Sequence, residues 1–256
     1  MASKPFSGRI ALVTGAASGI GAATARWLAD NGAASLVLVD LDAPGLEALD
    51  LPCPVHLFAG DVADEALWTG IEAQVPRIEH ALINAGIADG AVIVAQEFAA
   101  WQRMMAVNLD GSFLALRAAL RIMARGQGPR SAVLTSSVVG IKPVAMTAAY
   151  GSGKAAIAHL ARIAAAEHAK DGIRVNAVAP GRVETAIWTK TAHFAALAQE
   201  LGSEQAALEA LREQSRATGE PFATSDQLAA QIGFLLSDAA ANITGTVLVS
   251  DGGYSL

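Results

Sequence analysis

Tyr150, Lys154 and Ser137 are the residues whose types and spacing best suit proton transfer. Tyr150 and Lys154 lie four residues apart in an alanine-rich segment typical of a helix, so they share one helix face. Ser137 ends the apolar run 131–137, which we expect to be a buried strand. Open parallel sheets bind their ligands at the carboxyl ends of strands. The spacing therefore predicts that a phenol, an ammonium and a hydroxyl meet at one edge of a sheet.

A lysine beside a tyrosine changes what the phenol can do. A free tyrosine has a pKa of about 10 and is a weak base at neutral pH. An ammonium about 4 Å away stabilises the phenolate by about 4 kcal/mol at an effective dielectric constant of about 20, equivalent to about three pKa units. We expect Lys154 to lower the pKa of Tyr150 toward the range that suits general acid–base catalysis, while Ser137 holds the substrate oxygen. Many helices carry this spacing by chance, so other features must support the interpretation.

A glycine-rich turn near the start of the chain predicts a dinucleotide site. Residues 14–21 read TGAASGIG, between an apolar strand at 9–14 and a helix at 18–31. Gly15 allows a tight turn, and Gly19 and Gly21 let the backbone and the helix N-terminus approach a pyrophosphate. No G-K-[ST] follows, which excludes a P-loop.

Asp40 ends the second predicted strand, 19 residues after Gly21. An acid at this offset binds the 2′-hydroxyl of an adenosine ribose and repels the 2′-phosphate of NADP. Asp42 adds negative charge, and positions 14–21 and 41–42 contain no Lys or Arg. We therefore expect NAD rather than NADP; the alternative is that Asp40 only caps a turn.

Strand-like and helix-like segments alternate along the chain, which predicts an α/β fold with a Rossmann-type, doubly wound, parallel seven-stranded sheet. We expect one domain over residues 1–256. The excursion at 186–222 breaks the alternation and suggests a helical substrate lid that contains Trp188, although an ordinary helical hairpin would give the same pattern. The expected strands cover 9–14, 35–40, 55–59, 79–84, 131–137, 173–179 and 246–250, and the main helices 18–31, 64–75, 98–125 and 149–170.

Composition excludes several classes of protein. The chain is 53% hydrophobic and 16% charged, which excludes a disordered protein. A net charge of −6 disfavours nucleic acid and anionic membranes as partners. Cys53 is the only cysteine, which fits a reducing cytoplasm and offers no cysteine-based metal site, and we expect no metal. We find no signal peptide and no apolar run of about 20 residues, so we expect a soluble cytoplasmic protein.

Together with Ser137, Tyr150 and Lys154, several further motifs make the whole chain resemble the short-chain dehydrogenase/reductase family. Asn84-Ala85-Gly86 matches the end of that family's N-N-A-G motif, with Ile83 in place of the first asparagine. The segment Pro180-Gly181 with Thr185 is similar to its P-G-x-x-x-T motif. Asp61-Val62 resembles its acidic pair beside the adenine, and Asn108 in VNLDG resembles its helix asparagine.

The resemblance implies a catalytic set of Asn108, Ser137, Tyr150 and Lys154. In it Tyr150 exchanges a proton with the substrate oxygen, Lys154 holds the nicotinamide ribose, and Asn108 keeps a water that links Lys154 to solvent. It implies that NAD (NAD+/NADH) is the cofactor and that relatives pair their long helices into homotetramers or homodimers. The implied cofactor-binding residues are Gly15, Ser18, Gly19, Ile20, Gly21, Asp40, Asp61, Val62, Asn84, Ala85, Gly86, Tyr150, Lys154, Pro180, Gly181, Val183 and Thr185.

The expected substrate is a neutral or hydrophobic secondary alcohol or ketone, because the residues expected around it are mostly apolar. They are Val139, Val144, Met146 and Trp188, with Ile87, Ala88 and Ile141 nearby and Lys142 as the one cation. We expect His193 of the lid to face solvent, with a polar contact to the substrate as the less favoured alternative. Two alternatives remain: an NADPH-dependent 3-ketoacyl-carrier reductase, and a catalytically silent NAD-binding sensor of the same fold.

Overall fold

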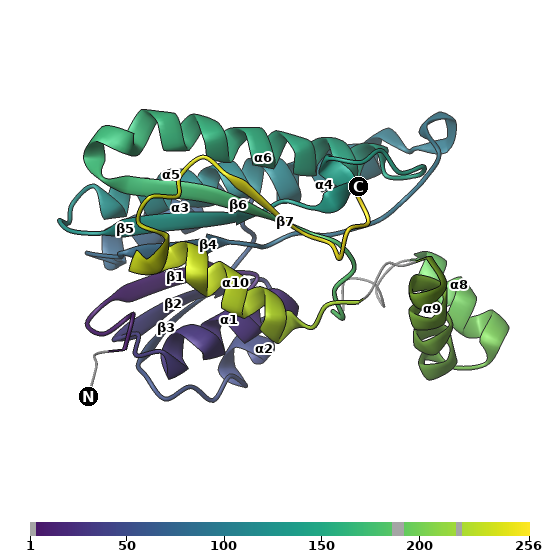
Figure 1. Cartoon of the computed structure of the whole chain (residues 1–256), viewed down its shortest axis with the longest axis horizontal. Helices are drawn as coiled ribbons and strands as arrows, with labels where there is room; N and C mark the ends of the chain where they lie inside the picture. The colour runs from purple at the N-terminus through teal and green to yellow at the C-terminus, as the bar shows by residue number, and fades with distance from the viewer. Residues whose placement is uncertain (1–3, 186–191, 219–221) are drawn as a thin grey trace.

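The computed structural model describes residues 4–185, 192–218 and 222–256, and a parallel sheet of seven strands forms its centre (Figure 1). The strand order is β3-β2-β1-β4-β5-β6-β7, and every pairing is parallel. Helices cover both faces, so the strands are apolar on both sides, as the sequence predicted. The strands are β1 (Ile10–Thr14), β2 (Ser35–Asp40), β3 (Val55–Ala59), β4 (His80–Ile83), β5 (Arg130–Thr135), β6 (Ile173–Pro180) and β7 (Val247–Ser250).

Two layers of helices bury the sheet, and each layer has its own apolar core. Figure 1 shows α3, α4, α5 and α6 on one side and α1, α2 and α10 on the other. The first layer comprises α3 (Glu65–Gln74), α4 (Phe98–Met105), α5 (Gly111–Met123) and α6 (Ala148–His168). The second comprises α1 (Gly19–Asp30), α2 (Ala43–Glu47) and α10 (Ser225–Leu236). The predicted Rossmann-type architecture is therefore confirmed.

Helix α10 was not among the predicted helices, although its start carries a clear sequence signal. The Thr224 hydroxyl accepts from the Gln227 backbone N–H, and the Gln227 side chain accepts from the Thr224 N–H, which is a capping box. This helix lies against α1 so closely that a Cβ added to Gly233 would lie 2.2 Å from the Trp27 ring. Its glycine is thus required by helix packing.

The helix predicted over 98–125 is interrupted. Between α4 and α5, residues Ala106–Asp110 form a π-helical turn, and Asn108 lies at its centre. Such turns insert one extra residue into the helical ladder and are frequent at functional sites. Amphipathic periodicity does not reveal so local a change, which is why one continuous helix was predicted.

Beyond the carboxyl end of the sheet, α8 (Ala192–Leu201) and α9 (Glu204–Thr218) form the helical part of the 186–222 excursion. They pack against each other, and Phe194 and Ala207 are buried. Figure 1 shows the pair standing apart from both helical layers. Arg212 of α9 donates to Glu184, at 2.9 Å, in the segment that follows β6. Among the described residues, no helix is both long and apolar enough to cross a bilayer.

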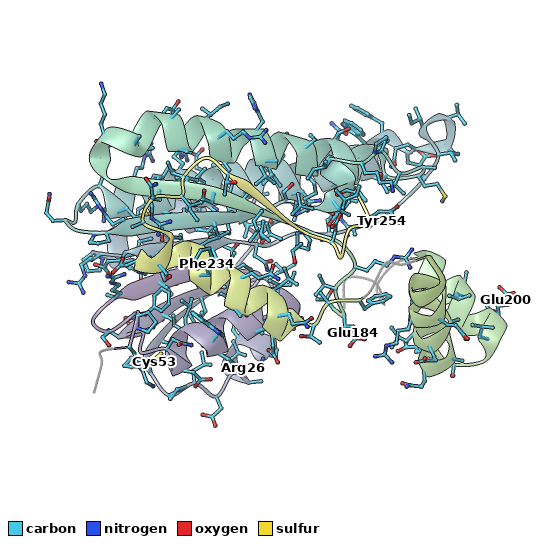
Figure 2. All side chains as sticks on the ribbon, in the orientation of Figure 1. Arg26, Cys53, Glu184, Glu200, Phe234 and Tyr254 are labelled. Atoms are coloured by element: carbon cyan, nitrogen blue, oxygen red, sulfur yellow. The ribbon has the colours of Figure 1, made fainter. Side chains whose placement is uncertain are left out.

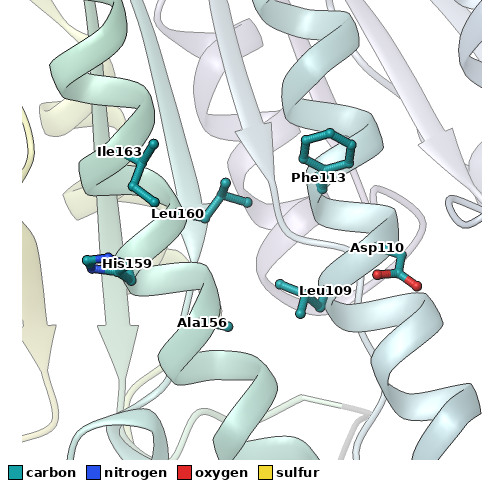
Figure 3. A pocket seen from close by; sticks show the side chains of 7 residues that line it. All are labelled: Leu109, Asp110, Phe113, Ala156, His159, Leu160 and Ile163. Atoms are coloured by element: carbon teal, nitrogen blue, oxygen red, sulfur yellow. The ribbon is translucent and has the colours of Figure 1, made fainter.

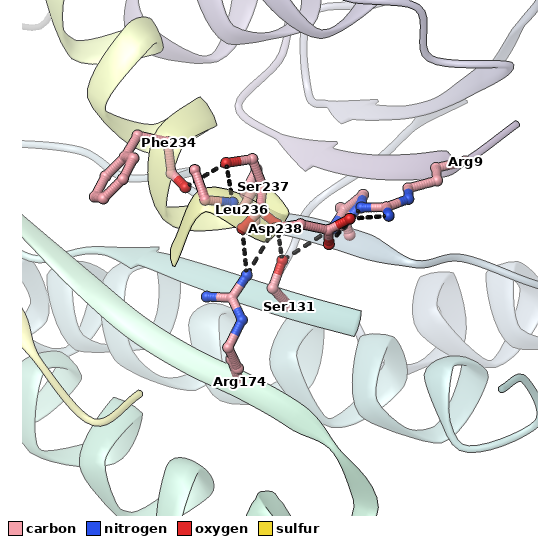
Figure 4. Close-up of polar contacts among 9 residues, drawn as sticks. Arg9, Ser131, Arg174, Phe234, Leu236, Ser237 and Asp238 are labelled. Carbon is pink, nitrogen blue, oxygen red and sulfur yellow. Dashed lines mark hydrogen bonds and ion pairs between the residues drawn. The ribbon is translucent and has the colours of Figure 1, made fainter. Parts of the chain in front are cut away.

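A polar network, partly buried, fastens the opposite, amino edge of the sheet (Figure 4). Arg9 forms an ion pair with Asp238, while Arg174 donates to the carbonyl oxygens of Leu235 and Ser237 at 2.7 and 2.9 Å. These contacts cap the carboxyl-terminal end of α10 with positive charge, which favours the helix dipole.

His80 occupies the centre of that network. The Ser131 hydroxyl donates its single proton to the Leu236 carbonyl oxygen, so at 2.9 Å it accepts from Nδ1–H of His80. Nε2 of His80 then faces the Arg9 guanidinium at 3.4 Å as an acceptor. Burial, together with the nearby charges of Arg9 and Arg174, lowers the pKa of His80 to about 3.

This depressed pKa predicts an acid-sensitive fold. The unfolded chain takes up a proton on His80 below about pH 6.5, whereas the folded chain resists until about pH 3. The contribution to the unfolding free energy is therefore complete above pH 6.5 and declines by up to about 1.4 kcal/mol per pH unit as the pH falls. Urea unfolding between pH 7 and 4 should show a shallower decline in His80→Gln. His56→Gln, at an exposed position of β3, is the matched control and should retain the wild-type slope; an unchanged slope in His80→Gln would refute this role.

Candidate active site

Ser137, Tyr150 and Lys154 meet at the carboxyl end of β5, as their spacing predicted. Ser137 follows β5 and is the N-cap of a short 3-10 turn at Val138–Gly140, and its hydroxyl hydrogen-bonds the Tyr150 side chain. Tyr150 and Lys154 lie on the first turns of α6. The Lys154 Nζ atom lies 5.6 Å from the centre of the Tyr150 ring. A phenol, a hydroxyl and an ammonium thus share one small region.

The Lys154 ammonium is held by the strand rather than by the phenol. Its Nζ donates to the carbonyl oxygen of Thr135, at 2.7 Å, and the side chain is almost wholly buried. Burial lowers the pKa of Lys154 to about 8. The carbonyl contact, which the sequence could not reveal, fixes the ammonium beside Tyr150 and leaves its other N–H donors for additional partners.

The expected drop in the pKa of Tyr150 does not occur in this structure. Burial raises the pKa of Tyr150 above its usual value, and the hydrogen bond from Ser137 opposes that rise only in part. The reason is that removal from water disfavours the phenolate. The lower pKa expected from the sequence took account of the attraction to Lys154 but not of the size of the burial effect. The free protein therefore holds Tyr150 protonated, as a proton donor.

Asn108 lies close to Lys154 but is bound to the chain itself. Its side-chain Oδ1 accepts from the Ile87 N–H at 2.8 Å, and its Nδ2 donates to the Ile87 carbonyl oxygen at 2.9 Å. A Cβ added to Gly86 would lie 3.0 Å from Asn108 Oδ1 and 3.5 Å from Lys154 Nζ. The π-helical turn therefore aims Asn108 at the loop after β4, and only glycine at position 86 leaves the contact undisturbed.

The glycine-rich turn has the shape of a phosphate cradle. Gly15 has a φ of +65°, and a Cβ on Gly21 would lie 1.9 Å from the Gly15 carbonyl oxygen, so the turn closes only with these glycines. Ser18 is the N-cap of α1, is exposed, and makes no capping bond with its side chain. Ile20 lies in the first turn of α1. The N–H groups of this helix end are suited to an anion such as a pyrophosphate.

Asp40 caps the glycine-rich turn, as the alternative to a role in cofactor binding predicted. One oxygen accepts from the Ala17 N–H at 2.9 Å and the other from the Asp42 N–H at 3.0 Å. Asp40 is still partly exposed, and an ionised carboxylate can accept about four hydrogen bonds. Asp42 caps α2 through the Gly45 N–H. The turn thus has carboxylates on its strand-end side, whether or not Asp40 also binds a ligand.

The other residues predicted to lie on the adenosine side of the cofactor differ in their solvent exposure. Asp61 is exposed and its carboxylate accepts from the Ala63 N–H, whereas Val62 is buried in the core. Asn84 joins three strands: its Nδ2 donates to the Thr14 carbonyl oxygen, and its Oδ1 accepts from the Thr135 hydroxyl at 3.1 Å. The Thr14 hydroxyl accepts from the N–H groups of both Asn84 and Ala85. Val62 and Asn84 therefore hold the framework of the site.

The segment after β6 lies against the glycine-rich turn. A Cβ on Gly19 would lie 3.1 Å from Cγ2 of Thr185, which brings the two predicted cofactor segments together. Pro180 ends β6 beside Ser250, and the Gly181 N–H donates to the Ser250 carbonyl oxygen. Val183 is buried and pairs with Ala223 at the base of the 186–222 excursion.

The predicted substrate residues line the loop that joins β5 to α6. Val139 and Val144 are partly exposed, whereas Met146 is about half exposed and has a φ of +69°, an uncommon backbone conformation for a residue with a side chain. The Ala91 N–H donates to the Met146 carbonyl oxygen at 3.0 Å and supports that conformation. Trp188 lies outside the described residues, and the side chain of His193 is likewise not described.

Comparisons with known proteins identify relatives that match almost the whole chain. A family model described as "Enoyl-(Acyl carrier protein) reductase" matches residues 15–255. The chain is 37% identical to a cis-4-hydroxycyclohexanecarboxylate dehydrogenase of Sinomonas cyclohexanicum, over 98% of both chains. It is 35% identical to a levodione reductase of Leifsonia aquatica, over 98% of this chain and 95% of the relative. A crystal structure of 3-ketoacyl-(acyl-carrier-protein) reductase from Brucella melitensis complexed with NADH superposes with a TM-score of 0.85 at 27% identity, covering 98% of this chain and all of that one.

Proposed function

Because this chain belongs to the short-chain dehydrogenase/reductase family, we propose that it is an NAD(H)-dependent oxidoreductase that interconverts a secondary alcohol and a ketone. The observation that carries this proposal is the convergence of Ser137, Tyr150 and Lys154 at the carboxyl end of β5. These three groups can bind a substrate oxygen and exchange a proton with it, which is what carbonyl reduction and alcohol oxidation require of a protein.

In the reducing direction, the Ser137 hydroxyl hydrogen-bonds the substrate carbonyl oxygen and Tyr150 donates its phenolic proton to it. Lys154 then stabilises the phenolate, because the Thr135 carbonyl oxygen holds the ammonium close to the ring. In the oxidising direction the same proton returns from the alcohol to Tyr150. Asn108 holds the Gly86–Ile87 backbone beside Lys154, and its water-holding role remains a prediction from the family.

The chain offers a consistent set of contacts for a nicotinamide cofactor. The helix end at Ser18–Gly21 suits the pyrophosphate, Asp40 and Asp61 the adenosine side, and Lys154 the nicotinamide ribose. When bound, the cofactor would donate a hydride to the substrate carbon during reduction and accept one from it during oxidation. The other proposed contacts are those inferred from the family motifs: Gly15, Ile20, Val62, Asn84, Ala85, Gly86, Tyr150, Pro180, Gly181, Val183 and Thr185.

We prefer NAD to NADP because of the charge at the end of β2. Asp40 and Asp42 present carboxylates there, and a 2′-phosphate would be repelled by them. The same feature disfavours an NADPH-dependent ketoacyl-carrier reductase, as does the net charge of −6, because an acidic carrier protein needs a basic docking surface. A silent sensor has no need of the intact set of Ser137, Tyr150 and Lys154.

We propose that the substrate is a neutral or hydrophobic secondary alcohol or ketone, bound beneath the 186–222 lid. Val139, Val144 and Met146 offer apolar surface, and the one cation of that loop, Lys142, is already bound to the C-terminal tail. The printed names of the relatives, a cyclohexanecarboxylate dehydrogenase and a levodione reductase, support cyclic substrates. We treat residues 1–256 as one catalytic domain, and the single Cys53 supports a cytoplasmic location.

The groove between α5 and α6 supports a homo-oligomer (Figure 3). Apolar side chains face it from both helices, and Phe113 and Ile163 remain 47% and 44% exposed. A second copy related by a twofold axis would bury both helix pairs against each other. Phe234 of α10 (labelled in Figure 2) and Val249 of the edge strand β7 are also exposed, which supports a second interface and hence a homotetramer. The groove is lined by Leu109, Asp110, Phe113, Ala156, His159, Leu160 and Ile163.

Tyr150→Phe tests the proposed chemistry. This variant keeps the ring and removes the exchangeable proton, so we expect turnover of secondary alcohols to fall by about 10²–10⁴-fold. NADH binding, followed by fluorescence, and the melting temperature should both stay close to wild type, because the hydroxyl's own protein contact is Ser137. Turnover within a few-fold of wild type would rule out Tyr150 as the proton donor.

Phe113→Glu tests the proposed groove interface. Two copies of the new carboxylate would be buried across a twofold axis, so we expect light scattering to show half the mass of the wild-type oligomer. Leu201→Glu, at an exposed position of α8, is the matched control and should leave the mass unchanged. A monomeric wild-type protein, or an unchanged mass in Phe113→Glu, would contradict the proposal.

A further inference from the structure

The C-terminal tail, residues 251–256, forms a compact turn around one carboxylate. Asp251 is buried, and its two oxygens accept from the N–H groups of Gly253 and Ser255 at 2.9 and 2.8 Å. The Tyr254 N–H donates to the Asp251 carbonyl oxygen, and the Leu256 N–H to that of Gly253. These bonds give residues 251–256 a defined shape.

The tail is anchored to one wall of the proposed active site. A Cβ on Gly181 would lie 2.9 Å from the Asp251 Cα atom, so the start of the tail lies directly on the turn that follows β6. The Gly181 N–H also donates to the Ser250 carbonyl oxygen. The tail therefore begins beside the segment proposed to bind the nicotinamide.

The other end of the tail holds the loop 138–147, which joins β5 to α6, through Lys142. The Lys142 Nζ atom donates to the Tyr254 carbonyl oxygen at 2.7 Å and lies 4.1 Å from the centre of the Tyr254 ring. The cation thus makes a hydrogen bond and a cation–π contact with one residue. Figure 2 shows Tyr254 near the C-terminus, at the same end of the molecule as the start of α6.

Lys142 is well placed to transmit this contact to the catalytic residues. Its backbone N–H donates to the Val138 carbonyl oxygen at 2.8 Å, in the 3-10 turn that Ser137 caps. A Cβ on Gly140 of that turn would lie 2.7 Å from the Ala155 nitrogen, so the turn rests on α6 beside Lys154.

The far end of the loop needs external support. Met146 has a φ of +69°, a conformation that L-residues adopt at a cost in free energy. The bond from the Ala91 N–H supports it on one side, and Lys142 ties the start of the loop to the tail. Two contacts with other segments, Met146 with Ala91 and Lys142 with Tyr254, therefore hold the loop that carries the proposed substrate contacts.

We propose that Tyr254 and Lys142 are positioning residues of the substrate site: the C-terminal tail clamps the loop 138–147 and thereby sets substrate affinity. The proposal rests on the proposed function for its kinetic consequence, while the clamp itself is a property of the folded chain. Loss of the clamp should loosen the loop and raise KM, and leave kcat nearly unchanged because Ser137 and Tyr150 keep their own contacts.

Amide hydrogen exchange of the folded protein tests the clamp without any substrate. In Lys142→Met, which removes both contacts, we expect exchange across 138–147 to rise about tenfold. Tyr254→Leu, which keeps the carbonyl and removes the ring, should raise it less. Tyr254→Phe and Lys142→Arg keep a ring or a cation and should restore protection. Lys170→Met, at an exposed position, is the matched control.

Steady-state oxidation of cyclohexanol with NAD+ tests the consequence. Lys142→Met should raise KM for cyclohexanol about tenfold with kcat within about twofold of wild type, and the double variant with Tyr254→Leu should be no worse. Exchange and KM equal to those of Lys170→Met, or a fall in kcat at constant KM, would overturn the proposal. A wild-type protein that oxidises no alcohol would refute the proposed function instead, and the exchange measurement would still decide whether the tail holds the loop.

Discussion

The hydrogen bond from the Lys154 ammonium to the Thr135 carbonyl oxygen is the contact on which the proposed active site depends. A buried cation is costly unless it is bound, and here it is bound by the last residue of a central strand. That bond sets the position of α6 relative to β5, and so places Tyr150 beside Ser137. The end of β5 thus fixes the position of the Lys154 ammonium, because a shift of α6 along the sheet would break its hydrogen bond to the Thr135 carbonyl oxygen.

The amino edge of the sheet carries structural contacts, whereas the carboxyl edge carries the groups proposed to bind ligands. At the amino edge, Arg9 pairs with Asp238 and Arg174 donates to carbonyl oxygens at the end of α10, which fixes this helix against the strands. At the carboxyl edge, glycines and exposed strand ends leave backbone N–H groups and side chains available for ligands. Stability is thus concentrated away from the region that must bind and release substrate. The buried His80 belongs to the first edge and takes no part in the proposed chemistry.

Most of the fold could be predicted because parallel strands buried on both faces are continuous apolar runs. The convergence of Ser137, Tyr150 and Lys154 could be predicted because it follows from local spacing on one strand and one helix. What could not be predicted depends on contacts between distant segments: the Thr135 carbonyl, and the π-helical turn at Asn108. The pKa of Tyr150 was misjudged for the same reason, since burial is a property of the whole fold.

The most direct test of the account is made on the wild-type protein. NAD+ and NADP+ are titrated in parallel, and oxidation of cyclohexanol and 2-heptanol is then followed by the absorbance of the reduced cofactor. We expect tighter binding of NAD+, because of Asp40, and turnover of at least one of these alcohols. Tighter binding of NADP+ would contradict the cofactor assignment, and binding of NAD+ with no alcohol oxidised would contradict the proposed reaction.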